Sequence, residues 1–446
     1  MSAYVGDSKL FRDQFGTPEM RAVFDDRMTV QKWLDTEVAL AAVQAALGMI
    51  PKEAAQAIAE TGDANTYDLA AMKAEMDRTS HPIVPLVRAM EAKCDPEWAG
   101  YLHWGATTQD IMDTGQILQI KNAWALVERD LATLTVNLAD LARKHRDTAM
   151  AGRTHGQQAL PLTFGYKVAI WLDEVRRHQT RMREAAPRVF RGQFAGAVGT
   201  MAAIGDQGIA VQAGLCKRLG LGVPIICWHS ARDTMAEAAF VMSAITGTMG
   251  KIANEIFLLS KTETAELEEP FPVGKVGSST MPQKRNPAIC EGVAAIARAA
   301  RYCMAPAMEG LVAETERDKV VLQAEREYVS RLHNLTHAAV VKIVALTGGL
   351  QVKADNMRRN LDITGGLLLS EAVMMALAPM IGRQEAHELI YQIAQRTAVD
   401  GGTLNEALKK SPEVSEILSE NEIHELLDPT TYTGLSGVFV DRVLDA

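Results

Sequence analysis

The sequence predicts an all-α fold, and three observations support this prediction. Long stretches place apolar residues three and four apart, which is the spacing of one face of a helix. No comparable set of alternating β-branched residues marks a group of strands. Aromatic residues make up only 5% of the 446 residues, fewer than is typical of a β-sandwich. We therefore expect helices to form nearly all of the regular structure.

Five stretches follow the helical spacing closely. The second of them contains no proline or glycine after Gly115, so a single long helix is expected there. Gly105 marks a turn, residues 152–161 are expected to form a loop, and only residues 192–204 allow a short extended segment. The expected helices cover residues 30–47, 114–145, 234–267, 290–304 and 313–346.

The chain is too long for one ordinary core, and domain boundaries are expected near residues 110 and 352. They give an N-terminal helical domain at residues 1–110, a central helix bundle at 111–352 and a C-terminal helical domain at 353–446. A helix of 30 residues spans about 45 Å. A bundle of such helices that is apolar on more than one face usually continues its packing into other subunits.

The composition excludes several classes of protein. With 48% hydrophobic and 23% charged residues, the chain is globular rather than disordered. Its net charge of −9 provides no basic footprint for nucleic acid, and no apolar run is long enough to span a membrane. The five cysteines are widely spaced without a C-x-x-C pair, which argues against a disulfide framework and a zinc site. We expect no metal, no cofactor and a cytoplasmic location, since the N-terminus lacks an apolar signal core.

Residues 270–287 form a long polar stretch, rich in glycine and proline, within an otherwise helical region. Loops of this length are often functional. A serine such as Ser278 or Ser279 acts as a base only if its alkoxide is stabilised, and backbone N–H groups and a nearby cation do this. Lys284 and Asn286 would suit a carboxylate whose charge grows during a reaction. A surface loop with solubilising charges explains the composition equally well.

The segment Gly277-Ser278-Ser279-Thr280-Met281-Pro282-Gln283-Lys284-Arg285-Asn286-Pro287 resembles the G-S-S-x-M-P-x-K-x-N-P signature of the fumarase/aspartase superfamily. Residues 103–110 (HWGATTQD), 152–157 (GRTHGQ) and 360–367 (NLDITGGL) are similar to further regions of that superfamily. Its members include fumarase, aspartase, argininosuccinate lyase, adenylosuccinate lyase and 3-carboxy-cis,cis-muconate cycloisomerase. The resemblance covers nearly the whole chain.

This resemblance implies a fold, an assembly and an activity. Family members form a homotetramer whose central bundles make a 20-helix core, and three subunits contribute to each active site. The reaction is an anti β-elimination on a small dicarboxylate or tricarboxylate, in either direction. The first serine of the signature, Ser278 here, is implied as the base, and Lys284 and Asn286 as carboxylate-binding residues.

The other matched positions receive roles in the same way. Thr107 and Thr108 correspond to the hydroxyl pair that binds substrate carboxylates, although simple helix N-capping would also explain them. His155 corresponds to the general acid of adenylosuccinate lyase, and His81 is expected to orient or assist it. The remaining residues expected to bind substrate are His103, Thr154, Gln157 and Ser279. Arg232 and Asp233 match a family pair that we interpret as mainly structural.

Two departures argue against a nucleotide substrate. Gln14 and Phe15 replace the Arg-Tyr pair of adenylosuccinate lyase, and Lys319 with its successors replaces a serine pair that contacts phosphate. Residues 101–114 and the Trp228-His229 pair resemble the cycloisomerase branch, whereas His155 resembles the C–N lyases. The favoured prediction is a lyase that releases fumarate from a small N-substituted aspartate or related succinyl compound. A carboxymuconate cycloisomerase, an adenylosuccinate lyase and a crystallin-like structural protein are the alternatives.

Overall fold

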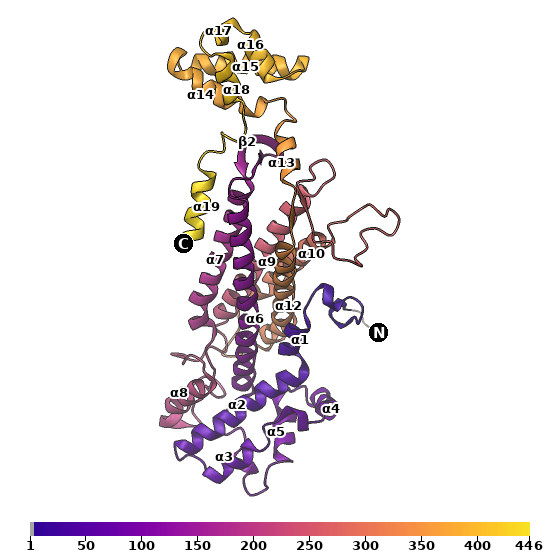
Figure 1. The fold of residues 1–446 in the computed structure, drawn as a ribbon. Coiled ribbons are helices and arrows are strands. Elements are labelled where there is room, and N and C mark those ends of the chain that lie inside the picture. The colour runs from indigo at the N-terminus through magenta and orange to yellow at the C-terminus, as the bar shows by residue number, and fades with distance from the viewer. Residues whose placement is uncertain (1–3) are drawn as a thin grey trace. The chain divides into compact units, whose positions relative to one another are not determined.

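The computed structural model describes residues 4–446, and within them it contains 19 α-helices, six short 3-10 helices and four short strands (Figure 1). The prediction of an all-α fold is confirmed. The N-terminal helices begin with clear sequence signals, since Thr17, Asp25 and Asp68 accept hydrogen bonds from backbone N–H groups of the first turns of α1, α2 and α4. These helices are α1 (Pro18–Phe24), α2 (Asp26–Ala46), α3 (Lys52–Ala59), α4 (Leu69–Thr79) and α5 (Ile83–Glu91).

Four long helices follow, of 37, 26, 27 and 30 residues. They are α6 (Thr108–Lys144), α7 (Phe164–Val189), α9 (Asp233–Leu259) and α12 (Lys319–Gly348). Shorter helices lie between them, namely α8 (Gly208–Leu219), α10 (Ala288–Tyr302) and α11 (Met304–Glu309). The C-terminal part contains α13 (Ala354–Leu361), α14 (Ser370–Ile381), α15 (Arg383–Asp400), α16 (Leu404–Lys410), α17 (Pro412–Ser415), α18 (Glu420–Leu426) and α19 (Ser436–Asp445).

The strands form two small antiparallel pairs. β1 (Ala149–Thr154) pairs with β2 (Gln157–Thr163), and β3 (Leu267–Glu268) pairs with β4 (Gln351–Val352). The expected loop at residues 152–161 is therefore wrong, because these residues belong to a hairpin. The expected extended segment at 192–204 is also wrong, since these residues form turns and irregular structure. The isolated bridge nearby joins Arg191 and Gly222.

Two predicted helices have different ends in the structure. α9 ends at Leu259 rather than at 267, because Ala265 adopts a left-handed φ of 49° and Glu266 is buried to bind Arg153. α12 begins at Lys319 rather than at 313, because the Asp318 carboxylate accepts hydrogen bonds from the N–H groups of Val320 and Val321. An aspartate in this position caps a helix and so fixes its first residue.

The chain divides into two compact units, each built from three separate segments. Unit 1 consists of the residues up to Leu131 with Arg177–Gly250 and Gly292–Lys342, and unit 2 of Ala132–Arg176, Lys251–Glu291 and Ile343–Ala446. Unit 1 has an apolar core around Leu34, Leu86 and Ile111. Unit 2 has one around Leu377, Ile390 and Leu408. The predicted domain boundaries near 110 and 352 stay a prediction.

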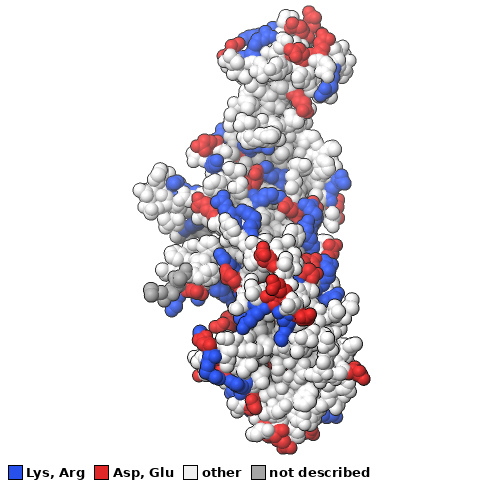
Figure 2. Space-filling model, turned by 180° about the vertical axis from the view of Figure 1, so that it is seen from behind, with Lys and Arg blue, Asp and Glu red and all other residues white. Residues whose placement is uncertain are grey.

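Basic and acidic side chains lie close to one another on the face drawn in Figure 2, and large uncharged areas separate these groups. Among the described residues, no helix has the length and apolarity needed to cross a membrane.

Candidate active site

The pair Thr107-Thr108 lies where α6 begins, in unit 1, and Asp110 holds this turn. The buried Asp110 carboxylate accepts hydrogen bonds from the N–H groups of Thr107, Ala195 and Gly196, each at 3.0 Å, and from His229 Nε2 at 2.8 Å. Burial opposes charge on His229, but the hydrogen bonds and charges of Asp110 and Cys227 outweigh it and raise the pKa of His229 to about 9. The threonine pair is thus held in place by the buried ion pair between Asp110 and His229.

His81 lies against this turn, before α5. Its Nε2 is 3.0 Å from Thr108 Oγ1, and its Nδ1 accepts a hydrogen bond from the Val84 N–H at 3.3 Å. Because Nδ1 is an acceptor, the neutral ring carries its proton on Nε2 and donates it to Thr108. Burial, and then the positive charges of Lys319, His103 and Arg317, lower the pKa of His81. The ring is therefore held neutral at neutral pH.

The surroundings of His103 shift its pKa in the opposite direction. Its Nδ1 is 2.6 Å from Oε1 of the buried Glu37, and its backbone adopts a left-handed φ of 56°. Burial works against charge on the His103 ring, but Glu37, by its charge and hydrogen bond, together with Asp110 raises the pKa. A non-glycine residue in this strained region marks a position that the surrounding structure fixes. The surroundings of His103 therefore favour the protonated form of its ring.

Two cations complete this group of residues and were not predicted as site residues. Arg317 Nη1 donates to Thr107 Oγ1 at 2.7 Å, and Lys319 Nζ donates to the Ser80 carbonyl at 3.2 Å. The sequence placed Arg317 in a Glu-Arg-Asp motif but gave no sign that the loop before α12 reaches Thr107. We call His81, His103, Thr107, Thr108, Arg317 and Lys319 the unit 1 cluster.

His155 lies at the tip of the β1–β2 hairpin in unit 2. Thr154 pairs with Gln157, so His155 and Gly156 are the two residues of the turn, with φ values of 51° and 76°. Positive φ at both positions defines a type I′ turn, which normally takes Asn or Gly. His155 adopts this unfavourable backbone conformation. It is exposed, as are Thr154 and Gln157.

A buried carboxylate anchors the hairpin close to its tip. Glu266 is fully buried and binds Arg153 through two hydrogen bonds of 3.0 and 2.7 Å. Asn360 Nδ2 donates to the same carboxylate at 2.8 Å, and the Asn360 carbonyl accepts from Gln158 at 2.9 Å. The predicted similarity around residues 152–157 and 360–367 therefore falls on two segments that contact each other. Together they hold His155 in place.

Ser278 lies in the irregular segment 270–287, also in unit 2. Its Oγ accepts hydrogen bonds from the N–H groups of Met281 at 3.1 Å and Thr280 at 3.3 Å. Two backbone donors aimed at a serine oxygen stabilise a negative charge on it, in the manner of an oxyanion hole. Such donors are suited to a serine that acts as a base.

The shape of this segment brings Lys284 back towards the serine. A Cβ on Gly277 would lie 2.3 Å from the Lys284 carbonyl oxygen, so only glycine allows this approach. The Glu269 carboxylate accepts from the N–H groups of Ile289 and Cys290 at the start of α10, and Glu268 pairs with Arg285 and Lys353. These contacts fix both ends of the segment. Within it, Ser279 and Lys284 are exposed and Asn286 is half-buried.

The predicted residues therefore fall into three groups: the unit 1 cluster, the hairpin tip and the Ser278 segment. Within residues 4–446 no hydrogen bond or ion pair joins Ser278 to His155. Arg232 is buried and binds Asp113 and Glu325, which agrees with its interpretation as a structural residue. No group of three or more His, Cys, Asp or Glu residues suited to a metal ion occurs in the described part of the chain.

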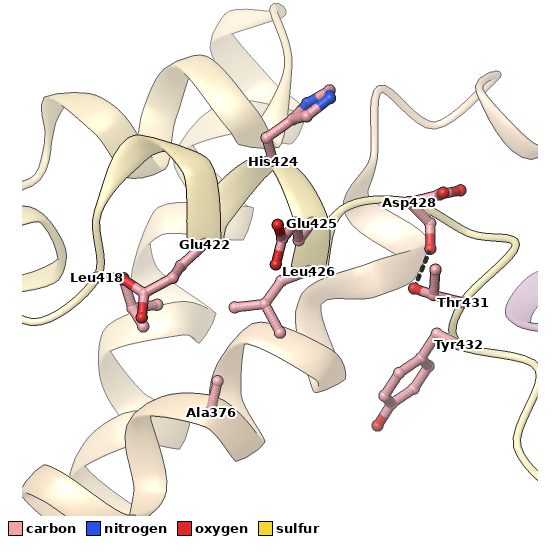
Figure 3. Close-up of a pocket in the computed structure, with 9 residues that line it drawn as sticks. All are labelled: Ala376, Leu418, Glu422, His424, Glu425, Leu426, Asp428, Thr431 and Tyr432. Carbon is pink, nitrogen blue, oxygen red and sulfur yellow. Dashed lines mark hydrogen bonds between the residues drawn. The ribbon is translucent and has the colours of Figure 1, made fainter.

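A cavity of about 790 Å³ lies in the C-terminal part and contains none of these residues (Figure 3). Its lining includes Glu422, His424, Glu425, Asp428 and Tyr432. Two of its carboxylates already have local partners, since Glu422 caps α18 with Ser419 and Asp428 binds Thr430. We therefore do not regard it as the active site.

Comparisons of the sequence point to one group of enzymes. A family model described as "Lyase" matches residues 12–301, and one described as "Adenylosuccinate lyase C-terminus" matches residues 366–443. The chain is 41% identical to N-acetyl-S-(2-succino)cysteine lyase of Enterococcus italicus, over 100% of this chain and 98% of that protein. It is also 41% identical to 3-carboxy-cis,cis-muconate cycloisomerase of Pseudomonas aeruginosa, over 98% of this chain and 96% of that protein.

The structures agree with the sequences. The crystal structure of 3-carboxy-cis,cis-muconate lactonizing enzyme from Pseudomonas putida matches with a TM-score of 0.93 and 38% identity, covering 98% of both chains. Similarity of this extent covers all three groups of candidate residues.

Proposed function

Because the chain belongs to the fumarase/aspartase superfamily and is a lyase, we propose that it releases fumarate from a small succinyl conjugate by anti β-elimination. The main support is the environment of Ser278. Its oxygen accepts hydrogen bonds from two backbone N–H groups, in a segment that also contains Lys284. These donors would stabilise the alkoxide that a serine base needs.

The first step is the removal of a proton from the carbon next to a carboxylate. Ser278, as its alkoxide, takes this proton, and the electron pair passes into the carboxylate to give a dianionic aci-carboxylate. Lys284 and Asn286 donate to that growing charge, and Ser279 assists. Fixed donors of this kind are each worth roughly 3 kcal/mol in the transition state.

The second step breaks the bond to the leaving atom. The electron pair returns from the aci-carboxylate to form the double bond of fumarate, and His155 gives a proton to the departing atom. Thr107 and Thr108 bind the other succinyl carboxylate, beside the guanidinium of Arg317 and the His103 ring, whose pKa is raised by Glu37. His81 holds the Thr108 hydroxyl in place. Thr154 and Gln157, which flank the His155 turn, contact the substrate at the hairpin tip.

The leaving atom is sulfur or nitrogen. Similarity to N-acetyl-S-(2-succino)cysteine lyases supports a thioether, in which a thiol leaves the succinyl carbon. A small N-substituted aspartate fits the same residues, since His155 would protonate a departing amine as well. We favour the thioether, because two N-acetyl-S-(2-succino)cysteine lyases match this chain over its full length.

A cycloisomerase that interconverts carboxymuconate and its lactone is the second candidate. It is supported by a relative at 41% identity and by the P. putida structure. That reaction shares proton transfer and carboxylate binding, but no separate leaving group departs. A general acid at position 155 therefore favours elimination.

The assembly we propose is a homotetramer in which different subunits supply Ser278 and His155 to one site. The absence of a bond between these residues in the described chain fits such sharing. Long helices rich in Ala, Leu and Met are suited to packing between subunits.

The test is turnover with a panel of substrates. The purified protein is incubated with N-acetyl-S-(2-succino)cysteine, N-substituted aspartates and carboxymuconate, while fumarate absorbance and free thiol are followed. We expect fumarate and thiol to appear in equal amounts from the thioether. Consumption of carboxymuconate with no fumarate from any succinyl compound would establish the cycloisomerase instead.

A further inference from the structure

The loop between α11 and α12 delivers two cations to the unit 1 cluster in a fixed manner. Arg317 donates to Thr107 Oγ1 and Lys319 to the carbonyl of Ser80, the residue before His81. The loop itself is ordered by Thr315, which has a φ of 56° and whose hydroxyl donates to the Arg317 carbonyl at 3.3 Å. Asp318 accepts from the N–H groups of Glu314 and Val320. Ser80 also adopts a left-handed φ, of 51°.

Neither cation is neutralised by the protein. Among residues 4–446 no carboxylate forms an ion pair with Arg317 or Lys319, whereas Arg232 and Arg331 both have such partners. His103, by contrast, is paired with the buried Glu37. Arg317 and Lys319 therefore present positive charge without an opposing carboxylate, which favours a bound anion.

The succinyl end of the proposed substrate accounts for only part of this charge. It brings two carboxylates, of which one goes to Lys284 and Asn286, and the other to Thr107 and Thr108 beside Arg317. Lys319 then remains on the His81 side of the cluster with no assigned partner. It lies beside His81, because its Nζ donates to the carbonyl of Ser80, the preceding residue, at 3.2 Å.

We propose that Lys319, supported by Arg317, binds a carboxylate on the leaving half of the substrate. The substrate is then a succinyl conjugate with at least three carboxylates, two on the succinyl half and one on the departing thiol or amine. This inference rests on the proposed function and specifies which succinyl conjugates the enzyme prefers. Lys319 is a specificity-determining residue and takes no part in the proton transfers.

The experiment compares two substrates that differ in one group. N-acetyl-S-(2-succino)cysteine carries a carboxylate on its leaving half, whereas N-acetyl-S-(2-succino)cysteamine has the same thioether without it. Each is tested with the wild type and with Lys319→Gln, and kcat and KM are measured separately from fumarate release. Lys121→Gln is the matched control, because Lys121 is also a lysine of unit 1 that donates to a backbone carbonyl, that of Gly220 at 2.7 Å.

We expect Lys319→Gln to lower kcat/KM for the carboxylate substrate roughly tenfold to a hundredfold, mainly through KM, as is typical of a lost charged hydrogen bond. The change with the cysteamine substrate should stay within about twofold, and Lys121→Gln should change neither. Equal losses with both substrates would overturn the inference, since Lys319 would then act on the succinyl half or on the fold. A wild type that releases fumarate from both equally well would overturn it too, and leave the proposed function intact. No fumarate from either substrate would instead remove the proposed function together with the inference.

Discussion

Two histidines of the same cluster have pKa values shifted in opposite directions by their surroundings. His103 pairs with the buried Glu37, which raises its pKa, whereas burial together with the charges of Lys319, His103 and Arg317 lowers the pKa of His81. The neighbours thus favour the charged form of one ring and the neutral form of the other. This separation suits a site in which one ring adds to the binding of an anion and the other orients a hydroxyl.

Ser278 carries the most direct test at the residue scale. We expect Ser278→Ala to reduce fumarate release roughly 10²- to 10⁴-fold, the usual contribution of general acid–base catalysis, without unfolding the protein. Its two backbone donors, from Thr280 and Met281, would remain in place without an oxygen to stabilise. Ser415→Ala, at an exposed serine of α17, is the control. Near-normal turnover in Ser278→Ala would show that another group is the base.

His229 makes a prediction about pH and stability. Its pKa is raised from 6.5 to about 9, so the stabilisation from its charge is complete below pH 6.5 and is lost as the pH rises through 9. We expect the wild type to lose up to about 3 kcal/mol of unfolding free energy across this interval from His229. His229→Gln should show a flatter profile in denaturant unfolding at pH 6 and pH 10, whereas His424→Gln, at an exposed histidine, should follow the wild type. Parallel profiles for all three proteins would contradict a charged His229.

At the scale of elements, the hairpin β1–β2 shows why the sequence was hard to interpret. Residues 152–161 contain Gly152, Gly156 and Pro161, which are typical of a loop. The strands form because Glu266 and Asn360, distant in sequence, bind Arg153 and Gln158. Local propensity is a weak guide where tertiary contacts of this kind supply the stability.

Gly277 tests the shape of the Ser278 segment. We expect Gly277→Ala to lower turnover at least tenfold, because its Cβ would lie 2.3 Å from the Lys284 carbonyl oxygen and push the backbone at Gly277 and at Lys284 apart. Global stability should change little, since the segment is mostly exposed. Gly100→Ala, at an exposed glycine with open space around it, is the matched control for activity. Unchanged kinetics in Gly277→Ala would mean that the close approach is not needed for catalysis.

At the scale of the whole molecule, the candidate residues are divided between two compact units. The unit 1 cluster holds the threonine turn, two histidines and two cations, whereas unit 2 holds His155 and Ser278. Each group is positioned by its own buried carboxylates, Asp110 and Glu37 in one unit, and Glu266 and Glu269 in the other. A site assembled from several subunits requires groups that are ordered independently in this way.

Hybrid enzymes test the proposed sharing. Ser278→Ala and His155→Ala should each be nearly inactive alone, but mixing them with subunit exchange should restore about a quarter of the sites, because random assembly joins an intact serine and an intact histidine at that frequency. Fumarate release by hybrids purified with two different affinity tags measures the recovery. Verified hybrids without any recovery would show that both residues come from one chain.

The sequence by itself determined the all-α class, the long helices, the superfamily and the irregular segment that carries Ser278. Helical periodicity and an eleven-residue signature are local properties, and neither depends on distant contacts. Only the tertiary structure decided the hairpin under His155, the support of Thr107 by Asp110 and His229, and the approach of Arg317 and Lys319 to the cluster. Thr107 and Arg317 are 210 positions apart, and no motif indicated that they meet. Buried ion pairs and packing bring these two residues together in space, and no local sequence pattern predicts such contacts.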